Sequence, residues 1–210
     1  RTFSGCSRLA SINIPNSVTS IGTEVFSSSG IISINIPNSV TSIGYGAFSY
    51  CYSLTSVNIP SSVTSIEGWA FSGCSGLRNV VIPGRINFKD NFSTYSNIDT
   101  VIIAGGSDSI CNSSFQRCSK IKYISIPSSV KSIGESAFKG CTGLTSINIP
   151  NGVTKIENGT FSGCSGLTSI NIPSGVTEIK GSTFSGCKGL TSINIPNSVT
   201  NIGESAFYGC

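Results

Sequence analysis

The sequence predicts a repeat solenoid of about nine stacked coils, each of 23 residues, that forms one domain over residues 1–210. Regular proline spacing is the first observation behind this fold class, because a fixed period of roughly 20–50 residues is typical of solenoids. Successive prolines are separated by 22, 23, 23, 44, 23, 23 and 23 residues. The interval of 44 marks one coil without its proline, in which Ala104 takes that position. The prolines are Pro15, Pro37, Pro60, Pro83, Pro127, Pro150, Pro173 and Pro196.

A phenylalanine recurs with the same period, and eight of the nine cysteines follow one of these phenylalanines by three residues. Identical residues that return at the same position form columns in a stack of coils, and a single coil could not bury them alone. The phenylalanines are Phe3, Phe26, Phe48, Phe71, Phe92, Phe115, Phe138, Phe161, Phe184 and Phe207.

Each coil begins with a short strand, as residues 144–166 illustrate. Ile147 and Ile149 alternate with polar residues, which is the period of a strand with one buried face. Pro150 ends this strand because it has no backbone N–H to donate. Val153 and Ile156 form a second short inward-facing pair, and a Ser-Gly-Cys-Ser-Gly sequence makes the closing corner. We therefore expect mostly strand and turn, with little helix.

Parallel coils stacked about 4.8 Å apart allow each apolar column to meet its own copy, which gives a rod or arc roughly 45 Å long. Residues 84–117 break the pattern, so we expect one irregular coil there. Both ends of the sequence fall within a corner and lack a polar capping coil. Because a solenoid needs caps to cover its terminal columns, we expect the chain to be a fragment of a longer array.

The string C-x-x-L-x-x-I-x-I-P-x-x-V-x-x-I-G-x-x-A-F-x-x-C resembles the BspA-like, treponemal-type branch of the leucine-rich repeats. Like that branch, the sequence places proline after the strand and lacks the buried asparagine of ordinary repeats, as at 150–153. The resemblance implies a right-handed solenoid or horseshoe with short parallel strands on its concave face. It also implies a protein at the cell surface or secreted, in a family whose members are often adhesins of host-associated bacteria and some protozoa.

The composition excludes several classes of chemistry. Only 10% of the residues are charged and there is no histidine, so a Ser-His-Asp triad and a histidine-ligated metal are both ruled out. We therefore expect no enzyme activity, no catalytic residues, no metal and no cofactor. No apolar run approaches the roughly 18 residues of a membrane span, which predicts no membrane insertion by this segment. A net charge of +4 with acidic residues interleaved does not favour nucleic-acid binding.

Most of the cysteines are expected to form a structural column of buried, reduced thiols. Stacked side chains point in parallel, whereas the two Cβ vectors of a disulfide converge. Cys111 lies off the column, and it is either a reactive thiol or an ordinary turn residue. The column consists of Cys6, Cys51, Cys74, Cys118, Cys141, Cys164, Cys187 and Cys210.

A candidate recognition patch comes from the outward positions of the middle strands. Regular coils carry Thr, Ser and Asn there, as at Thr145, Ser146 and Asn148, whereas the middle coils carry charged, aromatic and aliphatic residues. The entire net charge of +4 also lies within residues 78–139. Either this is a ligand-binding patch or one degenerate repeat has drifted. The candidate residues are Arg78, Asn79, Val81, Asp99, Ile102, Lys122 and Tyr123.

Two functions fit these observations. The first is a non-catalytic binding module, an adhesin or receptor-type ectodomain whose partner is a host matrix protein, a cell-surface protein or a glycan. The second is a stalk or spacer without a specific ligand, which the near-identity of the flanking coils favours. Trp69, Tyr50 and Tyr52 lie near the corners and offer a small additional aromatic contact site.

Overall fold

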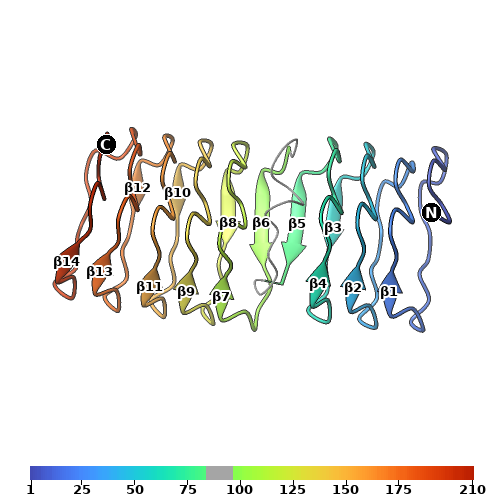
Figure 1. Ribbon diagram of the computed structural model, residues 1–210, viewed down its shortest axis with the longest axis horizontal. Helices are drawn as coiled ribbons and strands as arrows, with labels where there is room; N and C mark the ends of the chain where they lie inside the picture. The colour runs from blue at the N-terminus through green and yellow to red at the C-terminus, as the bar shows by residue number, and fades with distance from the viewer. Residues whose placement is uncertain (84–96) are drawn as a thin grey trace.

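A computed structural model describes residues 1–83 and 97–210, and in these residues the chain winds into a parallel β-solenoid without helices (Figure 1). The coils lie side by side in one long row, with the two termini at opposite ends. The predicted fold class is confirmed, but the predicted count of nine coils is slightly high, because the structure has about seven turns. Residues 84–96 lie outside the described residues.

One side of the solenoid, the strand face, carries the first strand of each coil. Its strands pair in parallel, and register partners are 23 residues apart, as the repeat period requires, except between β5 and β6, where they are 21 apart. Single bridges extend the row from Asn13 to Asn35 and Asn58, and from Asn171 to Asn194. The strands are β3 (Ser56–Asn58), β5 (Asn79–Ile82), β6 (Thr100–Ile103), β8 (Tyr123–Ser125), β10 (Ser146–Ile147) and β12 (Ser169–Ile170).

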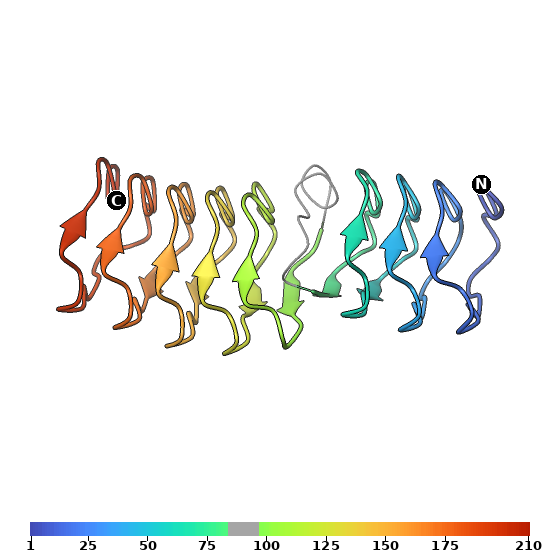
Figure 2. The ribbon, with the colours of Figure 1, turned by 60° about the horizontal axis from the view of Figure 1, so that its bottom comes forward.

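The second face carries the short strand that follows each proline, and it lies on another side of the coils (Figure 2). These strands also pair only in parallel with the equivalent strands of neighbouring coils. They are β1 (Ser20–Ile21), β2 (Ser42–Ile43), β4 (Ser65–Ile66), β7 (Ser109–Ile110), β9 (Ser132–Ile133), β11 (Lys155–Ile156), β13 (Glu178–Ile179) and β14 (Asn201–Ile202).

The core consists of the predicted apolar columns, and the phenylalanine column shows how they pack. The rings stack nearly parallel from Phe3 to Phe71 and from Phe115 to Phe207, with centroids 5.2–5.7 Å apart. Phe138 is fully buried between Phe115 and Phe161. Each coil therefore buries its ring only when both neighbouring coils are present.

Backbone hydrogen bonds join the coils in two opposite directions. On the strand face the bonds run both ways, as in any parallel sheet: the Lys122 N–H donates to the Asp99 carbonyl of the coil before it, and the Ile59 N–H donates to the Val81 carbonyl of the coil after it, both at 2.9 Å. At the phenylalanine corner, each coil donates to the coil after it, as the Phe138 N–H does to the Thr160 carbonyl at 2.9 Å. Both ladders pair backbone groups that would otherwise be buried without partners.

Each regular coil also turns at left-handed residues, including one position directly before the column cysteine. Glycine suits this position because it has no Cβ, and most described coils have it there. Three coils place a larger residue in the same conformation: Ser28 (φ 57°), Tyr50 (φ 59°) and Arg117 (φ 65°). The glycines at this position are Gly5, Gly73, Gly140, Gly163, Gly186 and Gly209.

Candidate functional site

The strand pairing brings the seven candidate residues together on β5, β6 and β8 and on the residues that directly precede these strands. A charged row runs across the strands from Arg78 to Asp99 and Lys122. The Asp99 N–H donates to the Arg78 carbonyl at 3.0 Å, and the Lys122 N–H donates to the Asp99 carbonyl, so each residue lies one coil from the next. Adjacent strands are about 4.8 Å apart. The row therefore presents positive, negative and positive side chains at that spacing.

Two further rows run beside the charged one. Asn79, Thr100 and Tyr123 are register partners in the second row, and the Tyr123 side chain is 59% exposed. In the third row, Val81 is half-buried and Ile102 is 41% exposed. The structure thus gathers all seven candidates into one continuous surface, which we call the strand patch. Whether a partner binds there stays a prediction.

The charged side chains of the strand patch do not neutralise one another. The Thr100 hydroxyl donates to Asp99 Oδ1 at 3.0 Å, and an Arg78 guanidinium nitrogen donates to the Ser75 carbonyl at 2.8 Å. Within residues 1–83 and 97–210, no ion pair joins Arg78, Asp99 and Lys122. Arg78 and Lys122 are exposed and Asp99 is half-buried, so the two cations in particular are available to a partner. Thr100 belongs to the same surface but was not a candidate residue, because regular coils carry another hydroxyl residue at this position, as at Ser146 and Ser169.

The coils on either side of the patch differ from it in chemistry. There, the threonine that begins the strand bonds to the preceding coil, as Thr168 Oγ1 does to the Thr145 carbonyl at 3.1 Å. Thr55 makes the same bond to the Ile32 carbonyl at 3.3 Å. Regular coils thus use this position to join one coil to the next. In the strand patch, this threonine is replaced by the charged residues Arg78, Asp99 and Lys122.

The cysteine column is regular, and its thiols bond to the backbone. Cys164 Sγ donates to the Phe138 carbonyl of the preceding coil at 3.1 Å, and Cys187 Sγ does the same to Phe161 at 3.2 Å. Burial raises the pKa of Cys164 and of Cys187 to about 12, so both are thiols at neutral pH. The expectation of burial is wrong for Cys6 and Cys210, which are exposed because they lie in the end coils. The buried members are Cys51, Cys74, Cys118, Cys141, Cys164 and Cys187.

Cys111 lies half-buried beside β7. Burial, with a smaller contribution from Asp108, raises the pKa of its thiol. A reactive cysteine needs the opposite shift, because the thiolate is the nucleophile. The local environment therefore favours the turn-residue interpretation of Cys111.

The aromatic residues near the corners are partly brought together. The rings of Tyr50 and Tyr52 lie 6.2 Å apart at 54°, and both are exposed. Tyr50 lies against Gly73, where an added Cβ would be 2.5 Å from the ring, so a larger residue at this position would displace the tyrosine. Trp69 is 51% exposed. Tyr45 is also exposed and had not been singled out.

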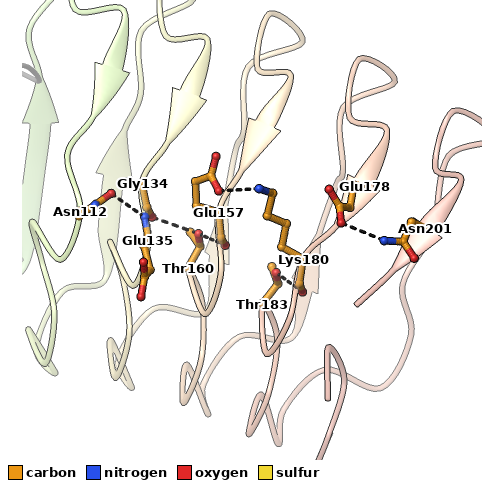
Figure 3. A network of polar contacts seen from close by, with 9 residues as sticks. All are labelled: Asn112, Gly134, Glu135, Glu157, Thr160, Glu178, Lys180, Thr183 and Asn201. Atoms are coloured by element: carbon orange, nitrogen blue, oxygen red, sulfur yellow. Dashed lines mark hydrogen bonds and ion pairs between the residues drawn. The ribbon is translucent and has the colours of Figure 1, made fainter. Parts of the chain in front are cut away.

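Polar side chains on the second face link neighbouring coils (Figure 3). Lys180 Nζ lies 2.9 Å from Glu157 Oε2, and the Asn201 amide donates to Glu178 Oε1 at 2.9 Å. Hydrogen bonding and the charge of Glu157 raise the pKa of Lys180. Because these side chains bind one another across neighbouring coils, we assign them a role in holding the coils together rather than in ligand binding.

In the described part of the chain, no three potential ligands form a group that could hold a metal.

The chain was compared with known proteins. A family model for the BspA type leucine rich repeat region matches residues 1–97 and 87–210, with six copies. A leucine-rich repeat protein from Bacteroides ovatus is 30% identical, with a TM-score of 0.71 over 99% of this chain and 60% of that chain. A leucine rich cell surface protein from Faecalibacterium prausnitzii is 28% identical, with a TM-score of 0.50 over 100% of this chain and 65% of that chain.

The chain therefore spans less than two thirds of the length of either structure. No curated protein matches the sequence. Among the described residues, no helix has the length and apolarity needed to cross a bilayer.

Proposed function

Because the chain belongs to the BspA-type leucine-rich repeat family, we propose that it is a non-catalytic module that binds a partner protein through the strand patch. The leucine-rich repeat fold is typical of non-enzymatic proteins and commonly serves protein interaction. The observation that carries the proposal is the continuity of the patch. Seven residues that depart from the repeat occupy adjacent positions on three neighbouring coils.

The composition of the strand patch suits protein recognition. Arginine and tyrosine are enriched among the residues that dominate binding energy at interfaces, and the patch has Arg78 and Tyr123. Val81 and Ile102 add apolar surface between neutral polar coils. The seven residues that form the patch lie on one continuous surface, which supports selection for contact over drift of a degenerate repeat.

We propose further that the protein acts at the cell surface or after secretion, as an adhesin or receptor-type ectodomain. The Faecalibacterium prausnitzii relative is described as a cell surface protein, which supports this location. The expected partners are host matrix or cell-surface proteins, with a glycan as an alternative ligand. The competing function is a stalk without a specific ligand, and the near-identity of the flanking coils favours it.

Restoring the residues of regular coils tests the binding proposal. Arg78→Thr, Lys122→Thr and Tyr123→Ser together give the patch the Thr and Ser that other coils carry at these positions, so the variant should fold. Immobilised matrix proteins and intact host cells would be probed with the wild type and with this triple variant. A matched control replaces Lys155, on the second face, with Ser. We expect capture by the wild type and the control and a loss of at least tenfold in the triple variant. Equal capture by all three proteins would refute binding through the patch and support the stalk.

A further inference from the structure

Four cationic side chains gather where the irregular part of the chain returns to regular coils. Arg117 and Lys120 lie in the turn that leads into β8, Lys122 directly precedes that strand, and Lys139 lies on the next coil. All four residues are exposed. We call this group the basic corner. Only Lys122 belongs to the strand patch, so the other three extend it around the edge of the solenoid.

Backbone contacts fix the corner residues close to one another. The Arg117 N–H donates to the Lys139 carbonyl at 2.6 Å. A Cβ added to Gly140 would lie 3.5 Å from Arg117 Cα and 3.6 Å from its Cγ, so the arginine stem lies along this glycine. These contacts place Arg117 and Lys139 side by side on adjoining coils, and Lys120 and Lys122 follow Arg117 within five residues of the chain.

The four cations of the basic corner form no ion pairs within the described residues, although Asp99 lies one coil before Lys122. In residues 1–83 and 97–210, no ion pair involves Arg117, Lys120, Lys122 or Lys139. Lys180, by contrast, is paired with Glu157. Like charges held together repel, and a bound anionic group would relieve that repulsion.

The backbone at Arg117 shows that the fold does not itself call for arginine at this position. Its φ of 65° lies in the left-handed region, which residues with a Cβ rarely adopt. Six other described coils use glycine at the equivalent position. The fold therefore does not require arginine there. Ser28 and Tyr50 adopt the same conformation in two other coils, so the exposed charge rather than the backbone conformation distinguishes Arg117.

We infer that the partner protein carries an acidic segment that binds the basic corner, while apolar residues beside that segment contact Val81, Ile102 and Tyr123. This inference rests on the proposed function and names the chemistry of the partner. The continuity of the basic corner with an apolar row favours a polypeptide over a sulfated polysaccharide or a nucleic acid. A polypeptide can present carboxylates and apolar side chains in succession, whereas the other two polyanions present charge along their whole length.

The test uses two fluorescent peptides, one of glutamates alone and one of glutamates followed by leucines. Binding would be measured by anisotropy at salt concentrations of about 0.05 M and about 0.5 M. The corner variant carries Arg117→Gly, Lys120→Gly and Lys139→Ser, which are the residues of regular coils. The matched control removes three other cations through Lys131→Thr, Lys155→Ser and Lys188→Ser. Heparin and single-stranded DNA serve as the competing polyanions.

We expect both peptides to bind the wild type at low salt, the leucine-containing peptide more tightly. The corner variant should bind at least about tenfold more weakly, since each exposed charge contact contributes modestly. The control should bind as the wild type does. Equal weakening in both variants would overturn the inference, because it would reflect net charge alone. Binding of heparin or DNA without binding of the peptides would overturn it as well.

The two proposals can fail separately. If the strand-patch variant loses capture of a matrix or cell-surface protein but the corner variant captures it normally, the acidic-segment inference fails and the binding function stands. If neither variant changes capture, both fail.

Discussion

Replacing Phe138 with alanine tests the idea that stacked columns hold the solenoid together. The ring is fully buried and stacks on Phe115 and Phe161, each at 5.6 Å between centroids. Removing a buried phenylalanine destabilises a protein by about 3–5 kcal/mol. Each aromatic pair adds about 0.5–1.5 kcal/mol beyond the buried area. We therefore expect Phe138→Ala to lower the free energy of unfolding by about 5 kcal/mol.

Phe207→Ala is the matched control in the last coil. Phe207 is half-buried and has one stacking neighbour in the described structure, Phe184, at 5.4 Å. The expected loss is about half that of Phe138→Ala. Urea unfolding followed by far-ultraviolet circular dichroism would measure both, with Trp69 fluorescence reporting on the N-terminal coils. Equal losses for the two variants would refute the reasoning, because they would show that the stacking neighbours contribute nothing.

Three other outcomes are expected. Arg117→Gly should stabilise the chain by about 0.5–1 kcal/mol in thermal unfolding, because relief of left-handed strain exceeds the entropy lost with glycine. Burial raises the pKa of Cys74, Cys164 and Cys187 to about 12 from an ordinary value of 9.0. A raised pKa in the folded state means that the stabilisation is complete below pH 9 and is lost as pH rises toward about 12, so the urea midpoint should fall over that range. Glu157→Gln should change stability by less than about 0.5 kcal/mol, since its ion pair is partly solvated, and a larger loss in urea unfolding would contradict this.

Much of the fold follows from the repeat in the sequence. Ile147 and Ile149 are buried and Asn148 is exposed, as the alternation predicts. The parallel register follows as well, because a constant period brings each strand beside its own copy. Burial of Cys6 and Cys210 was wrongly predicted, because a column covers only coils that have a neighbour on each side.

The position of the strand patch was also readable from the sequence, since all seven residues occupy outward strand positions. The rest of the basic corner was missed because Arg117 and Lys139 lie in turns, where strand alternation gives no information. Comparing each turn with its copies would have found Arg117 in a glycine position. The cross-coil pair of Lys180 and Glu157 could not be predicted, because it depends on the directions that two long side chains take.

The hydrogen-bond ladders have a consequence for the length of such proteins. In an α-helix all peptide dipoles point the same way and sum to partial charges at the two ends. Here the bonds of the strand face run in both directions along the solenoid axis, whereas the bonds of the phenylalanine corner run toward the following coil. Their dipoles cancel in part, so adding coils builds up less charge at the ends than aligned dipoles would. Repeat arrays of this kind can therefore lengthen by duplication with a smaller electrostatic penalty for each new coil.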